Sequence, residues 1–444
     1  MDKDRQGIRL IFLTYIGSIF LFAFILMLPI SNKVNLGFVD ALFTASSAIS
    51  CTGLIVKSTP MDFTVFGQVI IILMIQLGGF GYISMAVLLS MVLGKRLSYN
   101  DRMALKDSYE FPTMSGIVRF LRRVFLSILV IEAIGAILLS ARFSFDFGFK
   151  EALWLGAFHA ISAFNNAGFS LFDTSMMDYK GDLFINIIIC SLIIIGGLGY
   201  MVVLELYYLR IKIVPKLSNH TKTVLYSTLF LILLGMLLVY TLEFSNPKTL
   251  GELSWYEQLL TTFFTSVNFR TSGFNSLDVG SFSDSLLFFS TAIMIIGGAP
   301  GGTAGGIKIT TFVVLSVTAW YFLRGEAQPR LFSRAIPTTT IYKALSIAMV
   351  TVIYVCISTI IVVEIENRDF VKIFFELISA FATVGISVGD GGVVSYSALF
   401  SDSSKIIVAL LMFMGKIGVI TFSGVILGQT RKISIKYPEG SVIL

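Results

Sequence analysis

The hydrophobic residues of this 444-residue chain gather in long runs, and shorter polar segments separate these runs. A run of about 18 or more apolar residues is long enough to cross a bilayer as a helix. The pattern therefore predicts an all-α membrane protein with eight transmembrane helices. The expected spans are 8–30, 62–93, 117–141, 183–209, 223–243, 285–323, 344–366 and 405–428.

A shorter, less apolar segment lies between the two spans of each successive pair, and it ends in a glycine that follows a phenylalanine by ten residues. The four pairs are Phe43 and Gly53, Phe158 and Gly168, Phe263 and Gly273, and Phe375 and Gly385. The glycines are 115, 105 and 112 residues apart. This spacing predicts four span–pore loop–span repeats, 1–94, 95–212, 213–325 and 326–444, around a pseudo-fourfold pore axis.

Each short segment has about ten to twelve residues before its glycine, too few to cross ~30 Å of hydrocarbon as a helix. It is long enough to enter the membrane as a half-helix and return as extended chain. Such chain lies at membrane depth only where it is buried in protein or lines a watery cavity. Its carbonyl oxygens can then replace the hydration shell of an alkali cation.

The expected selectivity filter consists of the last four residues of each short segment. Its residues are Ser50, Cys51, Thr52 and Gly53; Asn165, Asn166, Ala167 and Gly168; Arg270, Thr271, Ser272 and Gly273; and Ala382, Thr383, Val384 and Gly385. One such glycine taken alone is equally well explained as a helix cap or a packing contact. Four in the same register favour the filter.

The sixth span is nearly twice as long as a bilayer requires, and its middle is rich in glycine. The ten residues are Gly297, Gly298, Ala299, Pro300, Gly301, Gly302, Thr303, Ala304, Gly305 and Gly306. Glycine costs a helix about 1 kcal/mol and proline about 3 kcal/mol relative to alanine, so the helix should break here. We expect a flexible loop beneath the third filter segment that acts as a gate.

A phosphate-binding loop is the competing interpretation of this segment, because Gly301 and Gly306 have the required spacing. The motif demands Lys followed by Ser or Thr after the second glycine, whereas Ile307 and Lys308 follow here. Nucleotide binding by this chain is therefore not expected.

Three basic residues lie where a charge is costly. Lys416 lies in the middle of the eighth span, where it would limit cation flux and pair with the glycine-rich loop, or else be held by carbonyls for packing. Lys308 is either a partner of the gate or an anchor that extends to the membrane surface. Arg270 would fold behind its filter segment and brace it by hydrogen bonds, unless it faces the vestibule.

Three further titratable residues lie within the predicted membrane segments. Glu132 and Glu205 are expected to pair with basic residues near the ends of their spans. His159 lies on a predicted pore helix, and we expect a packed or hydrogen-bonded side chain rather than a ligand.

The composition removes most chemistry from consideration. Of all residues 55% are hydrophobic and 14% are charged, against about 25% charged in ordinary soluble domains. Two histidines and three widely separated cysteines provide no metal or redox spacing. We expect no enzyme activity and no cofactor on this chain, because paired acids, a nucleophile and metal ligands are all missing.

The charge distribution predicts the orientation in the membrane. Segments 1–10, 94–123, 210–222, 324–343 and 429–444 hold 21 Lys and Arg and 7 Asp and Glu, whereas the opposite side holds 10 and 18. The basic side is cytoplasmic by the positive-inside rule, so both termini are expected there. Since topology explains the net charge of +6, nucleic acid is not an expected partner.

These features together resemble the superfamily of Trk, Ktr and HKT potassium transporters, most closely the membrane subunits of bacterial Ktr systems. The resemblance rests on the four repeats, their filter glycines, the broken sixth span and Lys416. It implies a homodimer in the cell membrane that conducts potassium, with sodium as a candidate activator. It also implies a cytosolic nucleotide-binding ring of the KtrA type. In this family a Ser in place of the first filter glycine accompanies sodium transport, so Gly53 favours potassium.

The alternative is a secondary transporter that couples a solute to sodium or protons. Such carriers usually have two-part inverted repeats and sites near the bilayer midplane. Four parallel repeats without a central acid argue against this alternative.

Overall fold

The computed structural model describes residues 3–81, 117–389, 394–419 and 422–423, and this part of the chain is mostly helical. The longer helices of its first half are α1 (Lys3–Met27), α2 (Phe38–Ser50), α4 (Val65–Phe80), α7 (Ile117–Phe143), α8 (Phe149–Phe164), α9 (Leu183–Gly197) and α10 (Tyr200–Arg210). Those of the second half are α11 (Asn219–Glu243), α12 (Trp255–Asn268), α13 (Asp284–Met294), α14 (Ile309–Leu323), α15 (Thr338–Glu366), α16 (Phe370–Phe381) and α17 (Asp402–Ile417).

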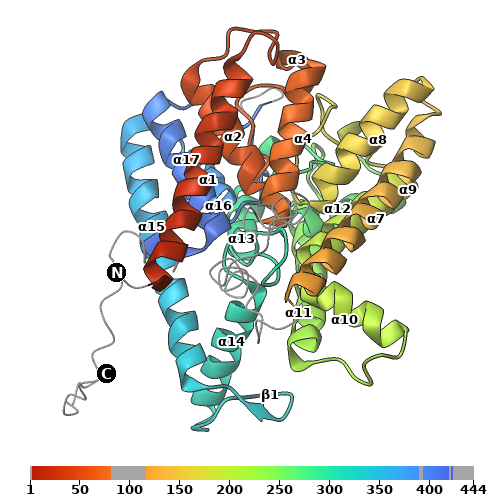
Figure 1. Cartoon of the computed structure of the whole chain (residues 1–444). Helices are drawn as coiled ribbons and strands as arrows, with labels where there is room; N and C mark the ends of the chain where they lie inside the picture. Colours follow the sequence, from red (N-terminus) through yellow and green to blue (C-terminus); the bar gives the residue numbers. More distant parts are fainter. Residues whose placement is uncertain (1–2, 82–116, 390–393, 420–421, 424–444) are drawn as a thin grey trace.

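Short elements complete the described chain. They are α3 (Thr59–Asp62), the 3-10 turns η1 (Met177–Tyr179), η2 (Val279–Ser281) and η3 (Tyr396–Leu399), and the strands β1 (Arg330–Leu331) and β2 (Arg334–Ala335). The two strands form an antiparallel hairpin between α14 and α15. In Figure 1 this hairpin extends from the bundle at the end opposite α3.

Three described helices are long and apolar enough to span a membrane: residues Arg119–Phe143 of α7, then α11 and α15. Helices α4, α13 and α14 and residues Phe12–Met27 of α1 are apolar but shorter. The predicted spans 62–93 and 405–428 extend into residues 82–116, 420–421 and 424–444, outside the described residues. The eight-span arrangement stays a prediction.

The fourth predicted span, 183–209, is not a straight helix. Helices α9 and α10 meet at an angle of 103°. Gly199 at the break has φ 86°, in the left-handed region that glycine adopts without steric cost. The bend frees the carbonyl groups at the end of α9 for contacts with another segment, described below.

Four short helices, α2, α8, α12 and α16, lie among the longer ones. Helices α2, α8 and α16 each pack between the two helices that flank them in sequence, and α12 packs on α11. Each also contacts a helix from another part of the chain: α8 contacts α4, α12 contacts α9, α16 contacts α13, and α2 contacts α17. These four contacts close a ring.

Polar contacts support the closure between α17 and α2. Ser46 donates a hydrogen bond of 3.1 Å to the carbonyl of Ala409. Lys405 Nζ lies 2.7 Å from Asp40 Oδ1. The last described helix is thereby fixed to the first short helix.

Two longer helices flank each short helix in sequence. A contact joins the chain at the end of the first of these to the start of the second. The contacts are Thr64 Oγ1 to the Ile30 carbonyl, Arg142 to Asp182, Ser283 to Glu243, and Ser401 to Glu366. Thr64, Asp182, Ser283 and Ser401 are all N-caps of their helices. Each contact thus joins the start of one helix to the chain at the end of another. In the last two, the carboxylate also accepts from the backbone amide of the serine.

The third of these braces gives a prediction for stability. Glu243 is fully buried and accepts hydrogen bonds from Ser283, Asn246 and Thr249. Glu243→Gln places an amide donor against these donors. We expect a loss of about 2 kcal/mol, measured as a lower melting temperature in detergent.

The matched control is Glu326→Gln, which removes the carboxylate from an exposed pair with Arg330. Exposed pairs contribute little, so its melting temperature should stay near the wild-type value. An unchanged melting temperature for Glu243→Gln would contradict the prediction.

Candidate functional site

The four predicted filter segments share one backbone path. In each, the residue two positions before the glycine has a left-handed conformation: Cys51, Asn166, Thr271 and Thr383 have φ between 52° and 64°. The glycines Gly53, Gly168, Gly273 and Gly385 have φ between 70° and 100°. Residues other than glycine adopt such backbone angles rarely. The short helices therefore end abruptly, and the chain continues without regular secondary structure.

These segments converge, although they are about a hundred residues apart in sequence. A Cβ atom on Gly53 would lie 2.6 Å from the Ala167 carbonyl oxygen. One on Gly168 would lie 2.5 Å from Gly273 Cα, and one on Gly385 would overlap the Thr52 carbonyl. The glycines thus lie around one common centre with no room for a side chain.

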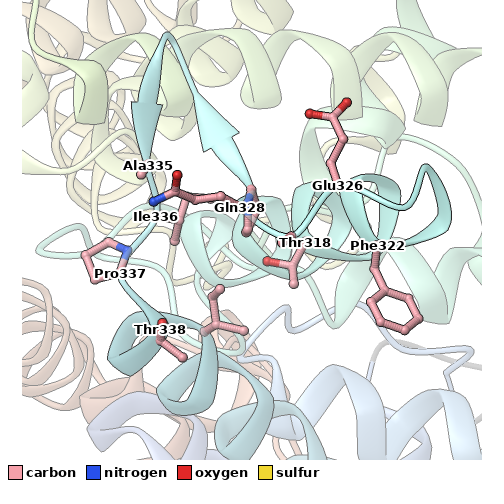
Figure 2. Close-up of a pocket in the computed structure, with 11 residues that line it drawn as sticks. Thr318, Phe322, Glu326, Gln328, Ala335, Ile336, Pro337 and Thr338 are labelled. Carbon is pink, nitrogen blue, oxygen red and sulfur yellow. The ribbon is translucent and has the colours of Figure 1, made fainter.

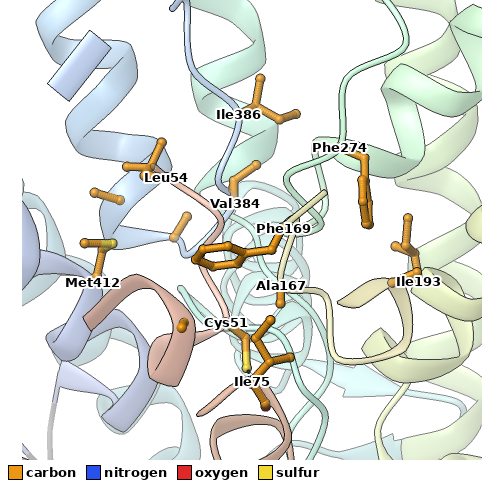
Figure 3. Close-up of a cluster of buried hydrophobic side chains, with 14 of the residues drawn as sticks. Cys51, Leu54, Ile75, Ala167, Phe169, Ile193, Phe274, Val384, Ile386 and Met412 are labelled. Carbon is orange, nitrogen blue, oxygen red and sulfur yellow. Dashed lines mark hydrogen bonds between the residues drawn. The ribbon is translucent and has the colours of Figure 1, made fainter. Parts of the chain in front are cut away.

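The residue after each glycine anchors its segment in the core. Leu54, Phe169, Phe274 and Ile386 are each at most 2% exposed. Figure 3 shows these side chains where the segments meet, beside Ala167 and Val384. These buried side chains fix each segment directly after its glycine. The carboxyl-terminal ends of the short helices, which carry partial negative charge, lie directly before these segments.

Polar side chains of the short helices hold the segments from behind. Ser47 accepts a hydrogen bond from the Gly53 amide, Ser162 donates to the Phe169 carbonyl, and Ser379 donates to the Ile386 carbonyl. In the third segment, Asn268 accepts from the Phe274 amide instead. The sequence analysis missed these residues, although a Ser six residues before three of the four glycines was a usable signal.

Two opposite segments have a second brace. His159 Nε2 lies 3.0 Å from Ser170 Oγ, and Glu376 accepts a 2.6 Å hydrogen bond from Ser387. His159 and Glu376 occupy the same position, nine residues before their glycines, and each serine lies two residues after. His159 is fully buried, so its expected role as a packed, hydrogen-bonded residue is confirmed.

The aligned phenylalanines behave less uniformly than the sequence suggested. Phe43, Phe158 and Phe375 are fully buried. In the third segment Phe263 is only partly buried, and its neighbour Phe264 is 1% exposed. In the third segment the fully buried ring is thus the one nine residues before the glycine.

The helix expected to break in the sixth span does break. Helix α13 ends at Met294 and α14 begins at Ile309, and residues 295–308 lie between them. The ends of this loop pair with each other, because the Gly297 amide donates to the Ile307 carbonyl at 2.8 Å and Ile296 bridges Ile307. We call residues 297–306 the glycine loop.

The glycine loop is bound to the helices around it by its own backbone. The Ala299 and Thr303 amides donate to the Gly197 and Gly196 carbonyls at the end of α9, at 2.9 and 3.2 Å. The Gly306 amide donates to a carbonyl of α17 at 3.2 Å. These bonds occupy the groups that the bend after α9 leaves free.

The loop also contacts two of the predicted filter segments directly. Thr303 Oγ1 donates to Asn166 Oδ1 at 3.2 Å, and the Gly305 amide donates to Thr383 Oγ1 at 3.0 Å. Asn166 and Thr383 are the left-handed residues of opposite segments. The loop therefore lies against the helix ends from which the segments leave.

Two lysines donate to carbonyl groups of the glycine loop. Lys416 Nζ lies 2.5 Å from the Thr303 oxygen and Lys308 Nζ lies 2.6 Å from the Ala304 oxygen. Both side chains are partly buried. Of the two interpretations of Lys308, the geometry favours a partner of the loop over an anchor at the membrane surface.

Arg270 lies inside the protein, as a position behind its filter segment requires. The side chain is 7% exposed, so it is buried rather than placed in a vestibule. Within the described chain, however, its Nε has no hydrogen-bond partner, and the predicted brace by hydrogen bonds is not seen there.

In the described chain both glutamates accept hydrogen bonds from neutral donors, and Glu205 also interacts electrostatically with the basic residue His220. Glu132 accepts hydrogen bonds from the amides of Gln76 and Asn165. Glu205 accepts from Ser218 and Thr221 at the start of α11. Amide and hydroxyl donors can hold a carboxylate as well as a cation can, and sequence spacing alone does not show which of them lies nearby.

A cavity of ≈ 410 Å³ lies between α14, the hairpin and α15, away from the four predicted filter segments (Figure 2). Its lining includes Thr318, Phe322, Gln328 and Ile336, and no predicted filter or gate residue. Among the described residues, no group of three or more His, Cys, Asp and Glu side chains could hold a metal ion.

Comparison with known proteins gives consistent similarities. The TrkH family model, described as a cation transport protein, matches residues 11–427. The Ktr system potassium uptake protein B of Bacillus subtilis is 39% identical, over 96% of this chain and 94% of that protein. The protein of the same name from Vibrio alginolyticus is 36% identical, over 100% and 96%. The crystal structure of the potassium transporter TrkH from Vibrio parahaemolyticus has the same fold, with TM-score 0.72, 17% identity and coverage of 96% of this chain and 85% of that one.

The contact between Lys416 and the glycine loop gives a prediction. Lys416→Met removes both the ammonium and its hydrogen bond to Thr303. A hydrogen bond from a charged group contributes roughly 1.5 kcal/mol or more, so we expect cation flux to rise by about tenfold, measured as rubidium uptake into proteoliposomes. Lys248→Met, at an exposed residue, should leave the flux unchanged. An unaltered flux in Lys416→Met would show that this contact does not restrict the pathway.

Proposed function

Because the chain belongs to the TrkH family of cation transport proteins, we propose that it takes up potassium across the cell membrane through a carbonyl-lined selectivity filter. The observation that carries the proposal is the convergence of four glycines, each with a positive φ, on one centre. Backbone carbonyls at such a centre can replace the hydration shell of potassium. The relatives from Bacillus subtilis and Vibrio alginolyticus are named as potassium uptake proteins.

The arrangement we propose is four span–pore loop–span repeats around a pseudo-fourfold axis, with eight transmembrane helices. The ring of contacts among α2, α8, α12, α16 and their neighbours supports this arrangement, as does the shared backbone path of the four segments. The boundaries 1–94, 95–212, 213–325 and 326–444 are those proposed for the repeats.

The glycine loop is the proposed gate of this pore. It contacts the helix ends of two opposite filter segments through Thr303 and Gly305, and Lys416 holds it from α17. A loop held by separate hydrogen bonds, from both backbone and side-chain groups, can be released by a modest change in its surroundings. We propose that a cytosolic nucleotide-binding ring of the KtrA type supplies this change.

The proposed assembly is a homodimer in the cell membrane, with both termini in the cytoplasm. The printed name of the relatives, potassium uptake protein B of a Ktr system, supports a system of several components. The excess of Lys and Arg on one side supports the orientation. Sodium is a candidate activator, and the chain needs no other cofactor for the proposed transport.

One observation favours the second candidate, a transporter coupled to sodium or protons. Glu132 is 5% exposed and lies in the middle of α7, whereas the sequence analysis assumed no central acid. Buried acids within the membrane often mark coupling sites. The four converging segments favour a pore nevertheless, and uptake measurements separate the two candidates.

Uptake by cells that lack their own potassium systems tests the function. The intact protein should take up potassium and rubidium in preference to sodium, without requiring a sodium or proton gradient. Gly53→Ser should lower this preference about tenfold or abolish uptake, because a Cβ there would lie 2.6 Å from the Ala167 carbonyl at φ 100°. If the wild-type protein does not discriminate between the ions, the coupled transporter becomes the favoured function.

Deletion of the glycine loop tests the gate. Residues Ile296 and Ile307 already form a bridge, so deleting 297–306 joins two residues that lie side by side. We expect severalfold higher potassium flux and weaker dependence on the cytosolic partner, measured in proteoliposomes with and without that partner. Unchanged uptake in the deletion variant would rule out the gate.

A further inference from the structure

A buried cluster of three polar side chains lies behind the second filter segment, and the transport pathway as described does not use it. The cluster consists of Gln76 on α4, Glu132 on α7 and Asn165, the first residue of that segment. We propose that Glu132 is a positioning residue which, acting through Asn165, determines how well the pore discriminates potassium from sodium. This inference rests on the proposed function.

The cluster fixes one filter segment to two helices. Asn165 Nδ2 donates to Glu132 Oε1 at 2.8 Å and to Gln76 Oε1 at 3.0 Å. Gln76 Nε2 donates to both carboxylate oxygens of Glu132, at 2.8 and 3.1 Å. Asn165 is fully buried, and a Cβ atom on Gly79 would overlap its Oδ1. The amide is therefore enclosed between α4 and α7.

The hydrogen bonds have a direction that only a carboxylate satisfies. Asn165 Nδ2 also faces the Ile161 carbonyl at 2.9 Å, so three acceptors surround it and its nitrogen is correctly placed. This fixes the oxygen of Gln76 toward Asn165 and its nitrogen toward Glu132. Both carboxylate oxygens of Glu132 must then accept hydrogen bonds. A glutamine at position 132 would place its own N–H group against the N–H group of Gln76 or Asn165.

The other segments have no such clamp at the corresponding position. Ser50 bonds within its own segment, to Ser47 and Thr52. Ala382 has no polar side chain, and Arg270 Nε has no hydrogen bond within the described chain. The second segment is thus the one described segment that a carboxylate ties to neighbouring helices at this position.

A clamp at this position affects ion selection in two ways. Carbonyl groups distinguish potassium from sodium by their spacing and by their field at the ion, and the clamp fixes the position of one of the four segments. Glu132 also brings a negative charge within hydrogen-bonding distance of the filter, where the protein interior screens it less than water does. A change that loosens the segment and removes the charge should reduce discrimination.

The test compares Glu132→Gln with a double variant, Gln76→Glu with Glu132→Gln. The exchange moves the carboxylate to α4, where its two oxygens face the amides of residues 132 and 165. Three of the four contacts again join a donor to an acceptor, and only the longest, at 3.1 Å between residues 76 and 132, sets two oxygens against each other. The control is Glu243→Gln, which disturbs another buried carboxylate that contacts no filter residue. The measurements are the ratio of potassium to sodium uptake, KM and maximal rate.

We expect Glu132→Gln to lower the uptake ratio about tenfold, the effect of one mispaired hydrogen bond to a charged group. The double variant should recover most of the ratio. Glu243→Gln should melt at a lower temperature and keep the wild-type ratio, which separates ion selection from general destabilisation.

Three outcomes would overturn the inference. The first is a wild-type ratio in a folded Glu132→Gln protein. The second is a folded double variant that shows no recovery, which decides the matter even if the single variant does not fold. The third is an unchanged ratio combined with a new dependence of uptake on the sodium or proton gradient, since Glu132 would then be a coupling residue. Failure of the wild type to take up potassium would instead refute the proposed function.

Discussion

Polar peptide groups inside a membrane must find hydrogen-bond partners or face water or an ion, and this constraint accounts for the centre of the molecule. Four segments bring their glycines together around one point, and polar groups behind that point are bound within the protein. Hydroxyl and amide side chains of the short helices bind the segments from behind. The glycine loop and the end of α9 satisfy one another in the same way.

The four repeated segments share a backbone path but not their supports. The first and third rely mainly on residues of their own short helix. The second and fourth add His159 and Glu376, which bind serines beyond the glycines. The second alone, among those described, is tied to a carboxylate of α7, and the fourth contacts the glycine loop through Thr383. The four segments therefore combine one repeated backbone path with unequal supports.

Glycine positions and apolar runs were informative because each reports a local property, either a permitted backbone angle or the length of a span. The break after Met294 and the four converging glycines were recognisable for this reason. The hydrogen-bond partners of Glu132 and Glu205 were not, because contacts between distant helices decide them. The bend after α9 was missed as well, since its freed carbonyls are satisfied by a loop that lies a hundred residues further along the chain.

The contact between α17 and α2 has a consequence for biosynthesis. Ser46 and Ala409 are 363 residues apart, and Lys405 and Asp40 are 365 apart. During translation the first short helix enters the membrane long before its last neighbour exists. The polar side chains of this helix find these partners only after nearly the whole chain has been synthesised. An interrupted polypeptide would expose them to lipid, a defect that quality-control proteases can recognise.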